Sequence, residues 1–327
     1  MKIGIIRGQE DSFPEALIAA INQKSQKRKL DLTAEFVKVE ALQMAESSPY
    51  RVIIDRISHE IPFYRAFLKH AAISGTHIIN NPFWWSADDK FFNYSIADKI
   101  GVPVPKTVLL PHKDHPPYTT AMSMRNLVYP IDWEEVFAYV GFPSFLKPHS
   151  GGGWKHVYKI HNREEFFSCF NQTGTLCMVL QEGIEFTEYY RCYTIGRKHV
   201  HIMRYDPTKA FLEQYIQNPP PLAKELEGKI IDYCVKINNA LGYDLNTCEF
   251  AVRDDIPYAI DFGNPAPDAD IKSVTKPNFD WVVDKMSDLA IERALKPPDS
   301  PKDYTWSEFI GNRVKPKRIS KTKRVKK

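Results

Sequence analysis

The chain has 327 residues, too long for one small core, and this length predicts two or three lobes. Hydrophobic residues make up 43% and charged residues 26%, as in ordinary globular proteins, and no apolar run approaches the roughly 20 residues that span a bilayer. The net charge of +4 hides an acidic body, because the last fifteen residues carry nine positive charges and no negative ones.

The cysteines and the basic end of the chain indicate where the protein acts and what it binds. Five cysteines form no CxxC pair, which favours reduced thiols in a cytoplasmic protein over a structural zinc site. Residues 301–327 are expected to be a solvated, disordered tail, with weak binding of nucleic acid as the alternative. The acidic body argues against a nucleic-acid-binding fold, and the lack of a long apolar run argues against a membrane partner.

Short strands and helices alternate over the first 86 residues. Apolar runs of a few residues predict strands, and apolar residues at helical spacing predict helices. The alternation predicts a small α/β lobe over residues 1–86. Its expected elements are strands Lys2–Arg7, Ala34–Val39, Arg51–Ile57 and His77–Asn80, with helices Phe13–Gln23 and Pro62–Ser74.

The next segment, from residue 87, begins with a helix and passes into an extended region. Ser86 is a candidate N-cap, and Gly101 ends the helix before two prolines stiffen the chain into a strand. Residues 111–131, rich in Pro, His and Thr, are expected to be an insertion or a mobile loop. Asp132 then caps a helix that Gly141 ends.

The remaining body is expected to contain two β-hairpins between helices. The first hairpin turns at Gly196-Arg197 and the second at Asp254-Asp255. The other expected elements are strands 143–148 and 155–160, a helix over 162–171, strand Leu176–Gln181, and helices Leu222–Leu241 and Trp281–Leu295.

The stretch FLKPHSGGGWKHVYKI, residues 145–160, places three adjacent glycines between two strands. It lacks the GxxxxGK[ST] spacing of a Walker A loop, and it does not open a helix as a dinucleotide-binding GxGxxG would. Glycines without a Cβ let backbone N–H groups approach phosphate oxygens closely. Lys147 at the strand end is placed to reach such oxygens as a mobile charge. A plain hairpin turn with a surface lysine is the alternative.

Four segments, taken in order, resemble the ATP-grasp fold, in the manner of ribosomal-protein-modifying glutamate ligases and glutathione synthetases. They are DKFFNYSIADKIGVPVPKT, FLKPHSGGGWKHVYKI, LQEGIEFTEYYRCYTIG and CEFAVRDDIPYAIDFGNPAPD, and the resemblance covers about residues 80–295. It implies an α/β (α+β) protein with an N-terminal lobe over 1–86 and an ATP-grasp domain over 87–300. That domain would consist of two α+β subdomains that clamp a nucleotide, with a hinge near 181–185.

The resemblance also implies which residues bind ATP. Lys90 and Lys147 would hold the α- and β-phosphates, the glycines would close over the triphosphate, and Lys155 would add a charge. Either Glu185 or Glu188 would accept hydrogen bonds from the ribose, and the shortened hinge leaves this choice open. Arg191 and Arg204 would pin phosphate oxygens or a substrate carboxylate, and with Lys147 they are the expected catalytic residues. The glycines are Gly151, Gly152 and Gly153, and the adenine-hinge residues are Gln181, Glu182, Gly183 and Ile184.

The metal ligands are expected on the second hairpin. Mg²⁺ prefers hard oxygen ligands and shares them with phosphate and water, and Mn²⁺ is the alternative ion. Glu249 and Asp261 lie on partner strands of that hairpin. The family usually ends the second strand with Glu-x-Asn, whereas this chain has Asp-Phe-Gly-Asn. A bulge at Gly263 would restore Asn264 to the metal, and without it one of two metals would be lost. The alternative for the carboxylates is a solvated hairpin face.

The resemblance implies an ATP- and Mg²⁺-dependent ligase that joins a carboxylate to an amine or thiol through an acyl phosphate, on an amino acid or a peptide. Phosphoryl transfer depends on positioning and charge neutralisation, which lysines, arginine and Mg²⁺ supply. The glycine loop and residues 111–131 are candidate lids. Two alternatives stay open: a small-molecule kinase of the same fold, and a catalytically silent nucleotide-binding protein. A homodimer is also expected from the family.

Overall fold

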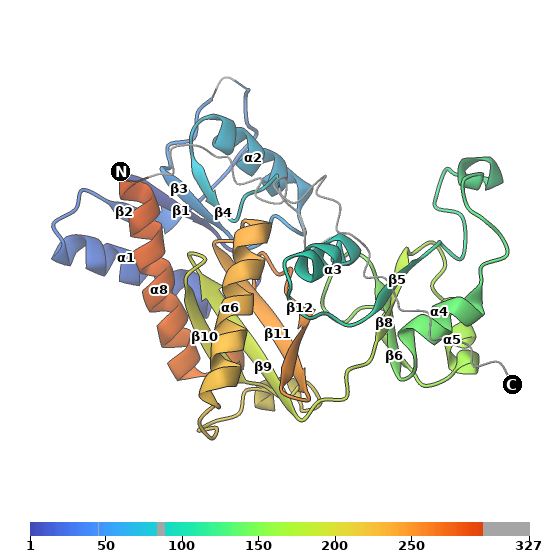
Figure 1. Ribbon diagram of the computed structural model, residues 1–327. Helices are drawn as coiled ribbons and strands as arrows, with labels where there is room; N and C mark the ends of the chain where they lie inside the picture. Colours follow the sequence, from blue (N-terminus) through green and yellow to red (C-terminus); the bar gives the residue numbers. More distant parts are fainter. Residues whose placement is uncertain (45, 84–88, 297–327) are drawn as a thin grey trace, which may run out of the picture.

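The computed structural model describes residues 1–44, 46–83 and 89–296, and it contains three four-stranded sheets (Figure 1). Each sheet forms one lobe with the helices that cover it. We call these the N-terminal, middle and C-terminal lobes, in the order in which their sheets begin along the chain. None of the described helices is both long and apolar enough to cross a membrane.

The N-terminal lobe is a parallel sheet with the strand order β2-β1-β3-β4, and the predicted alternation of strands and helices is confirmed. Helix α1 buries Phe13, Leu17 and Ile21 against the sheet together with Ile3 and Ile5. The parallel order follows from the crossover connections, because α1 and α2 each return the chain to the same end of the sheet. The elements are β1 (Lys2–Ile6), α1 (Ser12–Lys27), β2 (Thr33–Phe36), β3 (Val52–Asp55), α2 (Pro62–Ile73) and β4 (His77–Ile79).

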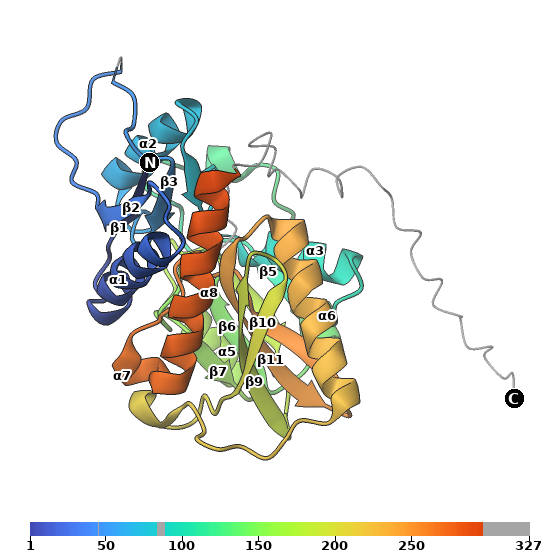
Figure 2. The ribbon, with the colours of Figure 1, turned by 90° about the vertical axis from the view of Figure 1, so that its left-hand side faces the viewer.

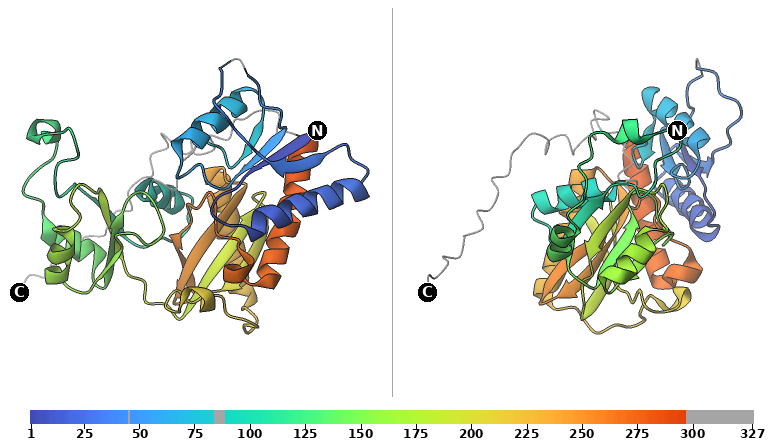
Figure 3. Two further views of the ribbon diagram at one scale, coloured as in Figure 1. Left: turned by 180° about the vertical axis from the view of Figure 1, so that it is seen from behind. Right: turned by 90° about the vertical axis from the view of Figure 1, so that its right-hand side faces the viewer.

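The middle lobe is an antiparallel sheet with the order β5-β8-β6-β7, and helices α4 and α5 pack on it (Figure 3). Residues 111–131 project from this lobe and contain the short 3-10 helix η2 (Figure 1). The elements are β5 (Thr107–Leu110), η2 (Ala121–Met124), α4 (Trp133–Val140), β6 (Ser144–Pro148), β7 (Tyr158–Ile160), α5 (Arg163–Phe170) and β8 (Met178–Glu182). Helix α3 (Lys90–Lys99) precedes them and packs its buried residues in the core of the C-terminal lobe.

The C-terminal lobe is an antiparallel sheet with the order β10-β9-β11-β12, and helices α6 and α8 cover its two opposite faces (Figure 2). Both hairpins turn where the sequence predicted, because Gly196-Arg197 and Asp254-Asp255 all have positive φ, as a tight hairpin turn requires. The elements are β9 (Glu188–Ile195), β10 (His199–Arg204), η3 (Phe211–Glu213), α6 (Lys224–Leu241), β11 (Leu245–Arg253), β12 (Ile256–Asp261), α7 (Ile271–Val274) and α8 (Lys276–Leu295).

Several observed boundaries differ from the predicted ones. Helix α3 begins at Lys90, and its N-cap is Asp89, whose carboxylate accepts a hydrogen bond from the Phe92 N–H at 3.0 Å; the predicted cap, Ser86, lies outside the described residues. Strand β7 begins only at Tyr158, because residues 151–156 form turns. Helix α8 begins at Lys276, five residues before the predicted start at Trp281, and it has a proline in its first turn. The tail over 301–327 also lies outside the described residues.

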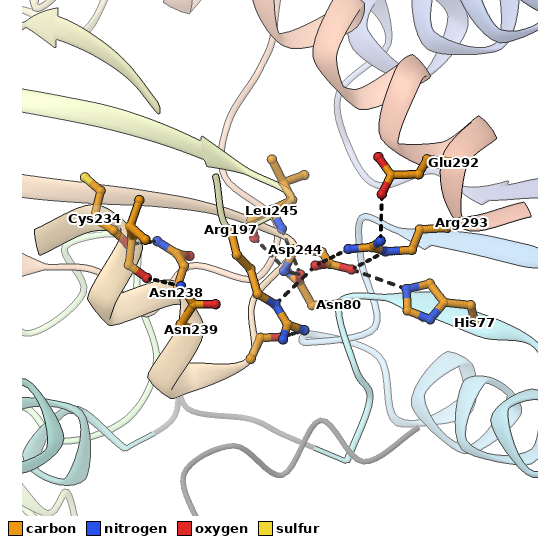
Figure 4. Close-up of polar contacts among 12 residues, drawn as sticks. His77, Asn80, Arg197, Cys234, Asn238, Asn239, Asp244, Leu245, Glu292 and Arg293 are labelled. Carbon is orange, nitrogen blue, oxygen red and sulfur yellow. Dashed lines mark hydrogen bonds and ion pairs between the residues drawn. The ribbon is translucent and has the colours of Figure 1, made fainter. Parts of the chain in front are cut away.

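A buried carboxylate joins the N-terminal lobe to the C-terminal lobe (Figure 4). Asp244 lies 3.2 Å from both Arg197 and Arg293 and 3.3 Å from His77, and its side chain is only 4% exposed. Burial raises the pKa of Asp244, but the contacts with His77, Arg197 and Arg293 outweigh burial and hold this pKa well below its usual value. Asn80 completes the junction, since its carbonyl accepts from the Asp244 and Leu245 N–H groups at 2.8 and 3.0 Å.

We predict that Asp244→Asn lowers the free energy of unfolding by about 3 kcal/mol at pH 7, because it removes the buried charge that two partly buried guanidinium groups share. Since the folded pKa is depressed, the stabilisation is fully present above the unfolded pKa near 4 and is lost as the pH falls through the lower folded value. Denaturant unfolding at pH 7 measures the loss. Asp31→Asn, at an exposed carboxylate, is the control; a loss no larger than that of this variant contradicts the prediction.

Candidate functional site

Three charged residues lie in one row across the sheet of the C-terminal lobe. Arg191 on β9 is the direct partner of Glu249 on β11, and Glu249 is the direct partner of Asp261 on β12. Side chains on directly opposite residues of an antiparallel pair share a face and lie about 5 Å apart at their Cβ atoms. The pairing register therefore brings together two predicted metal ligands and one predicted catalytic residue.

The two carboxylates of this row are suited to bind a divalent cation. Glu249 accepts a hydrogen bond from the Tyr189 hydroxyl at 2.7 Å and lies 3.7 Å from Arg191. Burial raises the pKa of Glu249, and the neighbouring charge of Asp261 raises it further, while Arg191 opposes this effect. Two such carboxylates that lack a full counter-charge match what Mg²⁺ requires from a protein when phosphate and water complete its shell.

The third predicted ligand, Asn264, is less firmly placed. The predicted bulge at Gly263 is found earlier, since the pairing register shifts between Glu249 and Phe250. The Asn264 N–H donates to the side-chain amide oxygen of Asn246 at 3.0 Å, which fixes the Asn264 backbone beside β11. Among the described residues no group of three His, Cys, Asp or Glu side chains is arranged to hold a metal. The structure therefore brings Glu249 and Asp261 together, and their role as metal ligands, like that of Asn264, stays a prediction.

Lys147 lies at the end of β6 in the middle lobe and is buried, with 9% exposed. Its amine donates to the Tyr94 hydroxyl and to the Gln181 carbonyl oxygen, both at 2.8 Å. Burial lowers the pKa of Lys147 to about 8, and Asp261 and Glu249 partly offset this effect. The lysine thus lies within electrostatic reach of both carboxylates, although it belongs to a different lobe.

Lys90 approaches the same space from the first turn of α3. Its backbone N–H donates to the His149 carbonyl at 2.8 Å, and its amine donates to the Gly151 carbonyl. A small pocket has Lys90 and Asp261 in its wall, together with Asn93, Tyr94, Phe262 and Gly263. Of the four charged residues that the sequence singled out, Lys90 and Asp261 line this pocket. Glu249 is the strand partner of Asp261, and Lys147 interacts electrostatically with both carboxylates.

The glycine loop beside Lys90 is exposed. Gly151 and Gly153 have φ of 83° and 72°, which L-residues rarely adopt, and a Cβ at any of the three glycines would meet nothing within 4 Å. Lys155 follows in the same exposed stretch. The loop is therefore free to close over a ligand, and its glycines are needed for backbone conformation and not for lack of space.

The hinge prediction needs a correction. The N–H groups of Glu182 and Gly183 donate to the carbonyls of Lys106 and Pro143 at 2.8 and 2.9 Å, so they do not point to a ligand. In the part of the chain that the structure describes, the Ile184 N–H donates to no backbone carbonyl. It is therefore the hinge N–H group that stays a candidate donor to the adenine. The side-chain oxygen of Gln181 accepts a hydrogen bond from Lys147, so Gln181 contacts that lysine, and its role at the adenine stays a prediction.

The structure separates Arg204 and Glu188 from the site. Arg204 is the strand partner of Tyr190, so it lies on the opposite face of the sheet from Arg191. It contacts Glu188 at 3.1 Å and donates to the Tyr190 hydroxyl at 2.9 Å. The expected role of Arg204 therefore does not fit its position. Of the two candidates for binding the ribose, Glu188 is paired with Arg204, whereas Glu185 is exposed.

The sequence reasoning missed two tyrosines that position site residues. Tyr94 bonds to Lys147 and also donates to the Ile260 carbonyl at 2.6 Å, so it joins α3 to both other parts of the site. Tyr189 bonds to Glu249. Their spacing was an available signal, because Tyr94 lies one helical turn after Lys90 and Tyr189 two strand positions before Arg191.

No protein-family profile matches the sequence, and a comparison with curated proteins finds no relative. Solved structures do match. The D-alanine–D-alanine ligase from Bacillus anthracis complexed with ATP has a TM-score of 0.64 at 17% identity, over 90% of this chain and 97% of that chain. The ATP-grasp ligase PsnB complexed with a minimal precursor, Mg and ADP has a TM-score of 0.58 at 13% identity, over 90% and 98%.

A RimK domain protein with an ATP-grasp fold, from Sphaerobacter thermophilus, has a TM-score of 0.59 at 16% identity, over 89% of this chain and 100% of that chain. These matches span nearly the whole length of each neighbour and agree with the three-sheet architecture. The chain has the ATP-grasp fold, as the sequence resemblance implied.

We predict that Gly183→Ala lowers the free energy of unfolding by about 1–3 kcal/mol, because its Cβ would lie 2.6 Å from the Pro143 carbonyl oxygen, a backbone atom that cannot rotate away. Gly152→Ala is the matched control, since its Cβ meets nothing within 4 Å and its φ is not positive. Denaturant unfolding of both variants compares them. Equal free energies of unfolding for the two variants would contradict the prediction, because the hinge backbone would then accommodate the added Cβ.

Proposed function

We propose that this protein is an ATP- and Mg²⁺-dependent ligase that joins a substrate carboxylate to an amine or thiol through an acyl phosphate. One observation supports the proposal: both lysines lie near the carboxylate pair, because Lys90 lines a small pocket with Asp261, and Lys147 interacts electrostatically with Asp261 and its strand partner Glu249. Cations opposite a carboxylate pair suit a nucleotide triphosphate and its divalent ion. The ligases among the structural neighbours support the same reading.

Each part of the site has one role in this proposal. Lys90 and Lys147 bind phosphate oxygens, and the exposed glycine loop closes over them and excludes water. Glu249 and Asp261 hold Mg²⁺, which would neutralise charge on the phosphates when bound, and Asn264 is a third candidate ligand. Arg191 stands beside Glu249, where a positive charge assists transfer of the phosphoryl group. Ile184 is the hinge donor for the adenine.

The substrate is proposed as an amino acid or a peptide. A neighbour that joins D-alanine to D-alanine and a neighbour solved with a peptide precursor support these two classes. The five free cysteines support a cytoplasmic protein. A homodimer, Mn²⁺ as the metal, and weak nucleic-acid binding by residues 301–327 stay predictions.

The proposal predicts that the purified protein converts ATP to ADP and phosphate in the presence of Mg²⁺ and a pool of amino acids or dipeptides, with an amide or thioester product that mass spectrometry detects. Glu249→Gln and Asp261→Asn are expected to lower this turnover on the order of 100-fold, because each removes a charged metal ligand. Glu225→Gln, at an exposed carboxylate of α6, is the matched control and should keep full turnover.

Other outcomes of this assay support the alternatives. ADP with a stable phosphorylated product and no amide identifies a kinase. Binding of ATP that Mg²⁺ does not change, without turnover, identifies a silent nucleotide-binding protein. Absence of ATP binding in calorimetry rejects all three.

The pKa of Lys147 gives a pH-dependent prediction. Burial lowers this pKa to about 8 in the free protein, so the Lys147 amine is mostly neutral at higher pH. There the amine must take up a proton before it can pair with a phosphate. The dissociation constant of MgATP should therefore rise by up to about tenfold per pH unit above pH 8. Lys147→Arg keeps its charge at these pH values and should show a flatter profile. Calorimetry between pH 7 and 9.5 tests the difference, and parallel profiles contradict it.

A further inference from the structure

A large aromatic side chain lies exposed at the tip of the glycine loop. Trp154 directly follows Gly153 and is 70% exposed. Its φ is 59°, in the left-handed region that bulky L-residues rarely adopt, and the φ of His156 is 56°. An exposed indole and a left-handed backbone both cost free energy, and such outliers are concentrated at ligand clamps and switch regions. A conformation that covers the indole is therefore favoured as soon as a ligand supplies a surface for it.

The base of the loop is fixed beside the candidate site. The His149 carbonyl accepts from the Lys90 N–H at 2.8 Å, and the Gly151 carbonyl accepts from the Lys90 amine. Lys90 also lines the small pocket together with Asp261. Three residues of chain span at most about 11 Å, so the backbone of Trp154 lies no further than this from the fixed Gly151. Trp154 is therefore within reach of the pocket that Lys90 and Asp261 line.

The pairing of β6 with β8 decides which end of a bound nucleotide the tip of the loop can cover. The two strands are antiparallel, because Ser144 pairs with Glu182 and Pro148 pairs with Met178. The hinge that begins at Glu182 lies at one end of β6, and the glycine loop leaves from the other end, roughly 14 Å away. In the proposed function the hinge receives the adenine. Trp154 therefore lies on the side of the phosphates and not on the side of the base.

The phosphate end is where water would divert the proposed reaction. An oxygen of the substrate carboxylate attacks the γ-phosphorus, the bond to the β,γ-bridging oxygen breaks, and ADP leaves with the electron pair of that bond. An amine or thiol then attacks the acyl carbon and expels phosphate. Water that attacks in its place returns the carboxylate and phosphate, so ATP is consumed without product. An apolar ring over the reacting atoms opposes this loss.

We propose that Trp154 shields the reacting end of the site from water: when MgATP binds, the loop closes and the indole covers the γ-phosphate and the acyl phosphate formed from it. This inference rests on the proposed ligase function, and it adds to that function a shielding residue at one position of the loop. The glycines allow the loop to close, and Trp154 supplies the cover.

The first test follows the fluorescence of Trp154 in the full chain. The non-hydrolysable ATP analogue AMPPNP with Mg²⁺ should shift the tryptophan emission to shorter wavelength and reduce quenching by acrylamide, because the indole leaves water. The shift should be absent in Trp154→Phe. It should remain in Trp281→Phe, the matched control on α8, where the ring stacks on His201 at 4.8 Å. MgADP lacks the γ-phosphate and should give a smaller shift.

Four results of this test would overturn the inference. Binding of MgAMPPNP in calorimetry without an emission shift would show that the indole stays in water, and the proposed function would remain. Equal shifts with MgADP and MgAMPPNP would place the ring away from the γ-phosphate. A shift that grows with protein concentration, without nucleotide, would show that a second copy of the chain covers the ring. Absence of MgAMPPNP binding in calorimetry would reject the proposed function and the inference with it.

The second test measures how much ATP is consumed for each product molecule. With Mg²⁺, ATP and the pool of amino acids or dipeptides, Trp154→Ala should raise the ratio of ADP to amide or thioester about tenfold, which equals about 1.4 kcal/mol in the barrier to water attack. Trp154→Phe keeps a ring and should raise the ratio less. The dissociation constant of MgATP should rise by a smaller factor than the ratio. An unchanged ratio in Trp154→Ala, with weaker MgATP binding, would show that the ring only binds the nucleotide and would overturn the inference.

Discussion

The pairing register of β9, β11 and β12 is the constraint on which the site depends. Direct pairing of Arg191 with Glu249, and of Glu249 with Asp261, sets the three charges in one row on one face. Successive residues of a strand point to opposite faces, so a slip of one residue on β11 would turn Glu249 toward the apolar face under α6. There Cys248 now lies fully buried beside Cys192. The charged row on the face toward α8 and the buried cysteines on the face toward α6 therefore specify the same register.

The charged residues of the middle and C-terminal lobes influence each other's pKa values. Lys147 is buried, which disfavours its charged form, and Asp261 and Glu249 are the groups that oppose this effect from the neighbouring lobe. Burial and mutual repulsion raise the pKa of Glu249, and the lysine is one of the groups that lower it. Each set of charges is therefore only partly balanced by the other. A bound metal ion would complete the balance for the carboxylates, and phosphate oxygens would do so for the lysines.

The local features were predictable from the sequence and the tertiary ones were not. The two hairpin turns are local, because Gly-Arg and Asp-Asp supply positive φ within two residues, and Lys147 was found because it ends an apolar run before three glycines. The face of Arg204 depends on the register of β10 against β9, which a motif does not state. The reach of Trp154 over the pocket depends on the bond of its loop to Lys90, and that contact exists only in the folded chain.

The low sequence identity to the structural neighbours is compatible with a shared fold for a related reason. At 13–17% identity the fold is retained, because alternation along strands, positive φ at turns and apolar helix faces are each met by many residue types. The charged residues of the candidate site lie on strands or at a helix start, where the fold itself fixes them. Trp154 lies instead on the connection between β6 and β7, and such connections vary freely in length and sequence. Residues on this connection can therefore change without disturbing the paired strands that carry Arg191, Glu249 and Asp261.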